Sequence, residues 1–180
     1  MNALIIRNRA IVEDAWQTLR ADANGTLPDA RALPAGKVLL PLALWQSARD
    51  ALRASRPRSG LGVWLPPDSD PAALADDFSH IALIGVDFPK FSDGRGYSIA
   101  RLLRERYGYQ GELRALGDVL RDQLAYMERC GFNAFAVRAD KDIHDALKAF
   151  GEITIHYQGA VDHPSPWRLR DAAQQEAGAA

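Results

Sequence analysis

Residues 80–98 read His-Ile-Ala-Leu-Ile-Gly-Val-Asp-Phe-Pro-Lys-Phe-Ser-Asp-Gly-Arg-Gly-Tyr-Ser, and this stretch decides the fold. Its first part, 80–86, is a short apolar run of the kind that forms a buried β-strand. The part that follows is dense in glycine and charge and predicts a loop. Apolar residues at helical spacing from Ile99 onward predict a helix. The stretch is therefore a strand, loop and helix in succession, the junction at which α/β proteins place ligand-contacting groups.

The same alternation continues on both sides of this stretch. Short apolar runs predict further strands, and residues at helical spacing predict helices between them. The predicted strands are 38–41, 61–65, 80–86, 112–116, 134–138 and 153–157. The predicted helices are 44–52, 68–78 with Asp70 as N-cap, one beginning near Ile99, 120–127 and 143–150.

This alternation predicts an α/β fold of repeated strand–helix units with a mainly parallel sheet, because each helix supplies the crossover that a parallel pair needs. Six strands from residue 38 onward, in a chain of 180 residues, fall short of a complete (β/α) barrel, which takes eight units and about 250 residues. We therefore expect either an open sheet or an incomplete (β/α) barrel.

The sequence divides into three parts. Residues 1–36 are predicted to form an N-terminal lead-in, with a short strand or hairpin at 4–12 that turns at Asn8 and a loop at 21–36 rich in Ala, Asp, Gly and Pro. Residues 37–163 are predicted to form a single α/β domain, and 164–180 a flexible tail.

Composition excludes several classes of function. The net charge of -1 removes the electrostatic case for binding nucleic acid or an anionic membrane, and no apolar run is long enough to span a membrane. One cysteine cannot form an intrachain disulfide or hold an iron–sulfur cluster. The four histidines have no metal-ligand spacing, and no nucleotide fingerprint occurs. We expect a cytoplasmic protein without metal, haem, flavin or other cofactor.

The loop after the predicted strand 80–86 carries groups suited to an anion. Lys90 and Arg95 lie on either side of Asp93 and Gly94, and Arg binds an oxyanion at two points whereas Lys acts as a point charge. Glycines let backbone amides approach a ligand, and the start of a helix favours an anion. The candidate substrate-binding or anion-binding residues are Lys90, Asp93, Gly94, Arg95, Gly96, Tyr97, Ser98 and Arg121.

Two aspartates are candidate catalytic residues. Asp87 directly follows the predicted strand, and Asp118 follows the next one. Because successive parallel strands end at one edge, we expect Asp118 or Arg121 to face Asp87 and Arg95 across a crevice. Either carboxylate is placed to act as an acid or base.

A purely structural interpretation explains the same residues without any ligand. Asp87 can brace its loop, Asp118 can cap a helix, and Ser98 is a good N-cap for a helix beginning at Ile99. Charged residues such as Arg121 commonly pair on the surface without any ligand.

Residues 80–138, above all Gly-Val-Asp-Phe-Pro-Lys-Phe-Ser-Asp-Gly-Arg-Gly-Tyr-Ser at 85–98 and Leu-Gly-Asp-Val-Leu-Arg-Asp-Gln-Leu at 116–124, resemble a bacterial family of unknown function. Its members are commonly described as probable oxidoreductases involved in sulfite reduction, because their genes lie beside that of the sulfite reductase haemoprotein. The resemblance implies a pathway and a partner, that haemoprotein, and brings no catalytic residues with it.

Three functions follow as hypotheses. The first is an accessory protein of assimilatory sulfite reduction that binds a small oxyanion, the haemoprotein, or both. The second is an enzyme that acts on a small phosphorylated or sulfur-containing anion with an Asp acid or base. The third is a structural assembly partner without a ligand.

Overall fold

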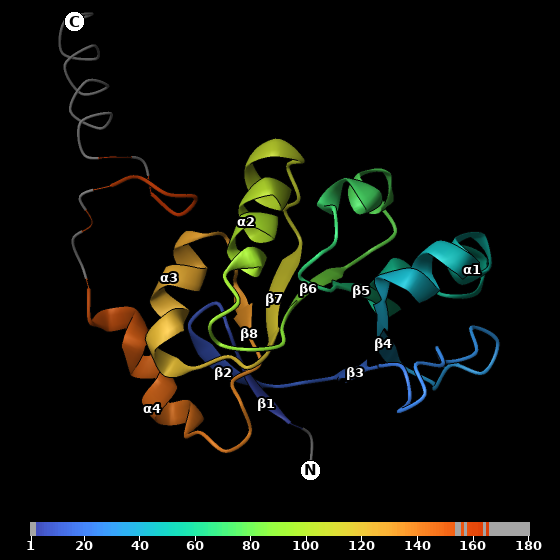
Figure 1. Ribbon diagram of the computed structural model, residues 1–180, viewed down its shortest axis with the longest axis horizontal. Helices are drawn as coiled ribbons and strands as arrows, with labels where there is room; N and C mark the ends of the chain where they lie inside the picture. The colour runs from blue at the N-terminus through green and yellow to red at the C-terminus, as the bar shows by residue number, and fades with distance from the viewer. Residues whose placement is uncertain (1–2, 154–155, 157, 164, 166–180) are drawn as a thin grey trace, which may run out of the picture.

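The computed structural model describes residues 3–153, 156, 158–163 and 165, and places its eight strands in one sheet. The sheet is a curled, open half-barrel of mostly parallel strands with helices between them, which confirms the predicted α/β class (Figure 1). The strands are β1 Leu4–Arg7, β2 Ala10–Glu13, β3 Trp16–Thr18, β4 Lys37–Pro41, β5 Leu61–Leu65, β6 Leu83–Phe88, β7 Glu112–Gly117 and β8 Ala134–Phe135. The α-helices are α1 Leu42–Ser55, α2 Arg95–Arg101, α3 Leu124–Arg129 and α4 Ile143–Leu147.

Shorter helical turns complete the connections. They are η1 Arg58–Gly60, η2 Pro71–Asp77, η3 Leu102–Arg106, η4 Arg121–Gln123 and η5 Lys148–Gly151. The predicted helix at 68–78 is thus a 3-10 helix, and its predicted cap is confirmed because the Asp70 side chain accepts the Ala72 N–H. Proline at the first position suits this start, since its missing N–H would have no partner there.

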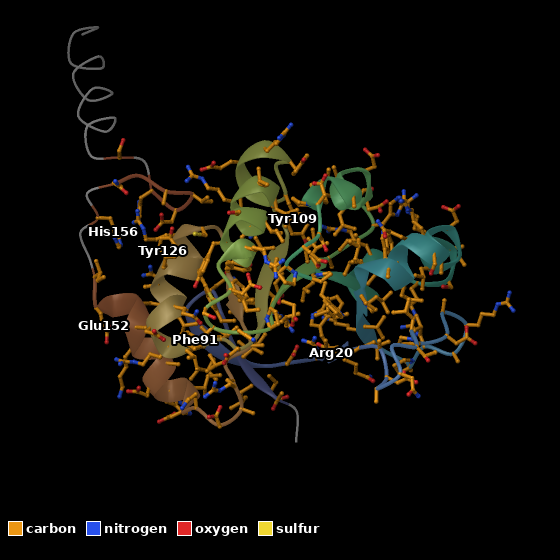
Figure 2. The ribbon with its side chains drawn as sticks, viewed as in Figure 1. Arg20, Phe91, Tyr109, Tyr126, Glu152 and His156 are labelled. Carbon is orange, nitrogen blue, oxygen red and sulfur yellow. The ribbon has the colours of Figure 1, made fainter. Side chains whose placement is uncertain are left out.

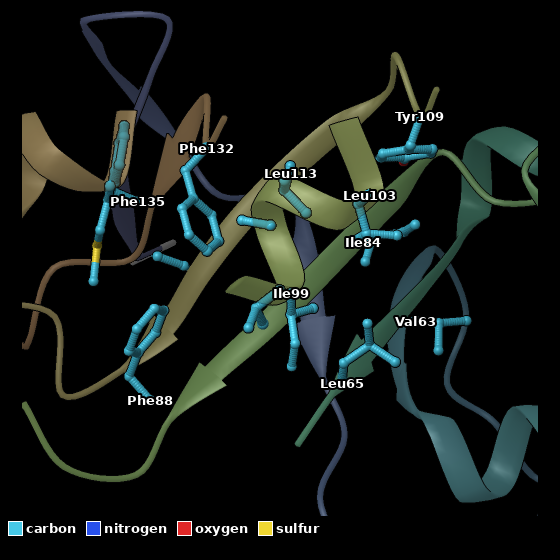
Figure 3. Packing of buried hydrophobic residues seen from close by; sticks show 14 of the residues in the cluster. Val63, Leu65, Ile84, Phe88, Ile99, Leu103, Tyr109, Leu113, Phe132 and Phe135 are labelled. Atoms are coloured by element: carbon cyan, nitrogen blue, oxygen red, sulfur yellow. The ribbon is translucent and has the colours of Figure 1, made fainter. Parts of the chain in front are cut away.

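Strands β3 to β8 are parallel and lie in chain order, so that β6 is central, with β5 and β7 on its two sides. The helical connections between successive strands from β4 to β8 all lie on the same face of the sheet. The buried apolar residues of α1, α2, α3 and α4 share one core with alternate residues of the strands. Figure 3 shows this core, where Ile99 and Leu103 from the α2 region pack against Ile84 and Leu113.

The opposite face of the sheet lines the inside of the curl and carries a smaller cluster. Leu39, Leu83 and Leu116 are buried there beside Trp16 and Trp64. Arg114 lies on the same face with 0% of its side chain exposed, and the Asp14 and Glu112 carboxylates accept its hydrogen bonds. The inside of the curl is therefore closed by side chains.

The N-terminal residues supply both edges of the sheet. β1 pairs antiparallel with β2 and β8, whereas β3 pairs with β4 at the other end of the strand order. Only Asp14 and Ala15 separate β2 from β3, which limits the gap between the two edges to three Cα steps, at most about 11 Å. The chain from β2 through β3 thus crosses the open side of the curl (Figure 1).

Several boundaries differ from those predicted. The hairpin is confirmed, with Asn8 and Arg9 both at positive φ in its turn, as a tight two-residue turn requires. The strand predicted at 134–138 is only Ala134–Phe135. Helix α2 begins at Arg95, four residues before the predicted start, because the Asp93 carboxylate accepts the Arg95 N–H. Most of the predicted strand at 153–157, and nearly all of the tail at 164–180, lie outside the described residues.

Candidate functional site

The carboxyl ends of the parallel strands form one rim of the half-barrel, and charged residues from four strands lie along it. Arg20 follows β3, Asp87 is the last residue but one of β6, Asp118 follows β7, and Arg138 follows β8. This is the rim at which open and barrel-like α/β folds bind ligands. We call it the carboxyl rim.

Asp87 lies within β6 rather than after it. The strand extends past the predicted end because its pairing with β7 continues to Phe88 and Gly117. Asp87 pairs with Leu116, so its side chain shares the inner face with the small cluster that includes Leu116. Its carboxylate is 12% exposed and accepts a hydrogen bond from Arg20, with Nη2 and Oδ1 2.6 Å apart.

Arg20 is held by an aromatic side chain as well as by Asp87. Its guanidinium lies 4.9 Å from the ring centroid of Trp64, whose Nε1–H donates to the Leu19 carbonyl oxygen at 2.9 Å. A cation over an indole ring is attracted to it. Trp64 therefore fixes both the chain before Arg20 and the guanidinium itself.

Asp118 braces the loop after β6. Its Oδ2 accepts the Phe91 N–H at 2.9 Å, and its Oδ1 accepts from Arg138 Nη1 at 2.7 Å. The Phe91 N–H and the Arg138 guanidinium lower the pKa of Asp118. Arg138 also bonds to Asp140 and lowers its pKa to about 2. A carboxylate with both oxygens bonded and a lowered pKa is a weak proton acceptor, so this geometry is that of a brace.

The predicted anion loop is held mainly by its own residues. Arg95 donates from Nε and Nη2 to Asp93, at 3.0 and 2.7 Å, and this pairing lowers the pKa of Asp93. Gly96 is required for packing, because a Cβ there would overlap the Phe88 ring. A Cβ at Gly94, in contrast, would make only an ordinary contact with the Tyr97 ring, at 3.9 Å. Lys90 is exposed and has no ion-pair partner among the described residues.

The helix start carries the remaining loop residues. Ser98 lies inside the first turn of α2, so its predicted role as N-cap is wrong, and Gly94 occupies the cap position. Tyr97 packs its ring 5.3 Å from that of Phe88 and 5.1 Å from that of Tyr126. Burial raises the pKa of Tyr97.

Arg121 points away from Asp87. Its Nε donates to the Asp145 carbonyl oxygen, and its Nη2 pairs with the Glu152 carboxylate. Asp87, Arg95, Asp118 and Arg121 thus each have a separate partner among the described residues. Sequence reasoning missed Arg20 and Trp64, which no local motif connects to Asp87.

A second feature that sequence reasoning missed is a group of aromatic side chains at the carboxyl rim. Phe91 and Tyr126 are each 58% exposed, and Tyr97 lies beneath Tyr126. Gln123 ties the Phe91 loop to the start of α3, since its Nε2 donates to the Phe91 carbonyl oxygen at 2.7 Å. We call Phe91, Tyr97 and Tyr126 the aromatic patch, and in Figure 2 the labelled Phe91 and Tyr126 lie near α3, well away from Arg20.

Two surface depressions in the described residues lie at the opposite end of the sheet. One is formed by residues that precede β4 and β5, among them Gly36, Lys37 and Arg56. The other lies around Tyr109, before β6 and β7, and includes Arg58 and Ser79. Neither contains a residue of the carboxyl rim. Within the described ranges, no group of three or more His, Cys, Asp or Glu is placed to hold a metal ion.

The fold and rim define an α/β protein built on a singly wound, curled sheet with its candidate groups at the strand ends. Residues 62–168 match the family described as "Bacterial protein of unknown function (DUF934)", and the chain belongs to that family. No curated protein matches the chain. In the part of the chain that the structure describes, no helix is both long and apolar enough to cross a bilayer.

Proposed function

We propose that this protein is an accessory protein of assimilatory sulfite reduction that docks on the sulfite reductase haemoprotein and takes a small oxyanion as ligand. The resemblance of residues 80–138 supplies the pathway and the partner. The observation that carries the docking surface is Phe91, which is 58% exposed although its loop is fixed from two sides. An aromatic ring held in water favours burial against a partner.

The aromatic patch has the properties of an interface centre. The Phe91 N–H and carbonyl oxygen are both bonded inside the protein, to Asp118 and Gln123 respectively. The main chain that carries the ring is thus held in place, and the Tyr126 ring on α3 is exposed to the same degree. Rigid aromatic residues contribute most of the binding energy in many interfaces, because little conformational entropy is lost when they bind.

A binding experiment with the purified haemoprotein tests the docking surface. The double variant Phe91→Ala and Tyr126→Ala should weaken the complex by roughly 30- to 1,000-fold, as expected for two central aromatic contacts. Leu27→Ala is the matched control, because Leu27 is also an exposed apolar residue and lies in another segment. Calorimetry that shows equal affinity for the wild type and the double variant would remove this surface from the proposal.

A genetic experiment tests the pathway separately. Deletion of the gene should impair growth on sulfate or sulfite, and added cysteine should restore it. The Phe91→Ala and Tyr126→Ala double variant should fail to complement the deletion, whereas Leu27→Ala should succeed. Normal growth of the deletion strain on sulfate would contradict the assignment to sulfite reduction.

A second candidate function rests on the pairing of Asp87 with Arg20. A carboxylate on the inner face, at the carboxyl end of a central strand, is placed as the acid or base of an enzyme acting on a small phosphorylated or sulfur-containing anion. Asp118 fits this role less well, because both of its oxygens are bonded. Turnover of such anions that falls at least about 100-fold in Asp87→Asn, with unchanged melting temperature, would favour this candidate. Absence of turnover and of ligand binding would leave the structural assembly partner.

A further inference from the structure

We propose that Arg20, Trp64 and Asp87 form the receptor for the oxyanion, and that this receptor selects an oxyanion that still carries a proton. The inference rests on the oxyanion part of the proposed function. It assigns the ligand to the inner face of the half-barrel rather than to the loop of Lys90 and Arg95. We call these three residues the Arg20 corner.

The first observation is the free donor edge of Arg20. Only Nη2 is bonded, to Asp87, and neither Nε nor Nη1 has a partner among the described residues. The guanidinium side chain is 48% exposed, so that its unused N–H groups face solvent. An arginine presents five donors in a planar fork, and two neighbouring N–H groups match two oxygens of an oxyanion.

The other arginines of the carboxyl rim do not offer such an edge. Arg138 uses Nε, Nη1 and Nη2 for Asp140 and Asp118. Arg95 and Arg121 each commit Nε and Nη2 to neighbouring groups. Among the arginines at this rim in the described residues, Arg20 therefore has the most donor capacity left for a ligand.

The second observation is the unused oxygen of Asp87. Arg20 bonds to Oδ1, and Oδ2 has no hydrogen-bond partner within the described chain. Oδ2 is not fully buried, so it reaches solvent at the rim. A carboxylate oxygen accepts hydrogen bonds and repels a bare oxyanion. A ligand that touches both Arg20 and Asp87 must therefore present an O–H as well as a negative oxygen.

The third observation is that the corner is rigid before any ligand arrives. Trp64 supports the guanidinium at 4.9 Å and is itself fixed through its bond to the Leu19 carbonyl oxygen. Asp87 lies in a central strand paired on both sides. Groups already held in position lose little entropy on binding, which favours selection of a small ligand.

Calorimetry with three inorganic probes tests the selection. At about pH 6, phosphate keeps protons on its oxygens and sulfate keeps none, and sulfite is largely singly protonated. Phosphate and sulfite should bind, and sulfate should not. Arg20→Gln should weaken binding of both by roughly 10- to 100-fold, the loss expected for a charge-assisted hydrogen bond. Arg31→Gln is the matched control, since it removes the same charge from an exposed site in the same segment and should change nothing.

Asp87→Asn gives the sharper test. The carboxamide donates where the carboxylate accepts, so this variant should gain affinity for sulfate and lose its preference for phosphate. Quenching of tryptophan fluorescence by phosphate is a second readout, and Trp64→Phe should abolish it. Equal binding of sulfate and phosphate to the wild type would overturn the inference. Loss of binding in Arg95→Gln but not in Arg20→Gln would place the ligand at the loop, which contradicts the inference and leaves the proposed function intact.

Discussion

Gly117 shows how closely the backbone is packed at the end of β7. Its φ is 88°, a region that residues with a Cβ adopt only at a cost. A Cβ at this position would also overlap the Phe88 carbonyl oxygen and lie 3.1 Å from Asp87 Oδ1. The glycine therefore lets β7 end beside Asp87 and turn immediately towards Asp118.

Gly117→Ala should reduce the free energy of unfolding by about 3 kcal/mol, from the unfavourable φ and the backbone overlap together. Gly108→Ala is the matched control. Gly108 also has a positive φ, of 69°, but open space surrounds it, so only the conformational cost of about 1 kcal/mol should remain. Urea denaturation of the two variants measures the difference. Equal losses would show that the overlap at Gly117 is relieved by a backbone shift.

The carboxylates bonded to Arg138 should stay ionised at lower pH than ordinary aspartates. The pKa of Asp140 is lowered to about 2 by Arg138, and that of Asp118 is lowered by the Phe91 N–H and Arg138. A carboxyl whose folded pKa is depressed stabilises the protein above its unfolded pKa, and this contribution is lost as the pH falls through the folded value. Carboxyl NMR titration should therefore find Asp140 still ionised at about pH 3.5 and the pKa of Asp118 below that of an ordinary aspartate. In Arg138→Gln, both pKa values should rise, and an unchanged Asp140 titration would contradict the role of Arg138.

At this scale the sequence singled out Asp87 as a candidate but not Arg20, with which the structure pairs it. Asp87 stands out because it directly follows the apolar run at 80–86 and begins a glycine-rich loop. Arg20 is 67 residues earlier in the chain, within a stretch without periodicity, and only the curl of the sheet brings it to Asp87. Sequence patterns of hydrophobicity report local structure, so a pairing that depends on tertiary closure leaves no such signal.

At the scale of elements, helix α1 and the 3-10 helix η2 are joined by one buried carboxylate. Asp77 is fully buried and accepts the Trp45 Nε1–H at 2.6 Å, while Arg53 pairs with its other oxygen. Arg49 lies 3.6 Å from the same carboxylate. Asp77 thus fixes two crossover segments to each other through their side chains.

Asp77→Asn should reduce the free energy of unfolding by about 1 to 2 kcal/mol, because it removes the buried counter-ion of Arg53 and Arg49, whose side chains remain partly solvated at 26% and 38% exposed. Asp50→Asn is the matched control. Asp50 is 98% exposed and lies 3.9 Å from the same Arg53, so its loss should change stability by less than about 0.5 kcal/mol. Thermal denaturation of both variants gives the comparison, and similar melting temperatures would show that Asp77 is not needed as an ion.

The presence of each strand and helix was easier to predict from the sequence than the residues at which it begins and ends. The strands at 38–41, 61–65 and 112–116 are confirmed almost as predicted, because each is an apolar run that the sheet buries. The predicted start of α2 was wrong because Gly94 takes the cap position and the helix begins before its apolar residues, with the Asp93 carboxylate accepting the Arg95 N–H. β8 is shorter than its apolar run because pairing on both sides stops at Phe135.

At the scale of the whole molecule, the ion cluster of Arg114 holds the closing chain in place. Asp14, between β2 and β3, accepts hydrogen bonds through both of its oxygens from Arg114 at 2.9 Å.

Asp14→Asn should lower the free energy of unfolding by about 3 kcal/mol, because Arg114 is fully buried. The exposed Asp68 offers a control, and Asp68→Asn should have little effect. Hydrogen exchange should speed up in β2 and β3 of the Asp14 variant, and unchanged protection there would refute the closing role.

The sequence predicted the class of the sheet but left its shape open between an open sheet and an incomplete barrel. The half-barrel follows from chain closure, which depends on the short passage from β2 to β3. Those strands are four and three residues long, too short for a strong periodic pattern. The proposed docking surface was predicted only in part for a related reason, since the exposure of Phe91 and Tyr126 is a property of the assembled rim.

The pairing of β1 with β8 has a consequence for how the protein is made. A ribosome releases the N-terminus first, yet β1 finds its parallel-sheet neighbour only when residues 134–135 have emerged. Until then the β1–β2 hairpin has no partner beyond itself, and a lone hairpin is marginally stable in water. The first strands to be synthesised are therefore among the last to be secured, and during translation the open edge of β7 and the apolar hairpin are exposed to chaperones and to other chains.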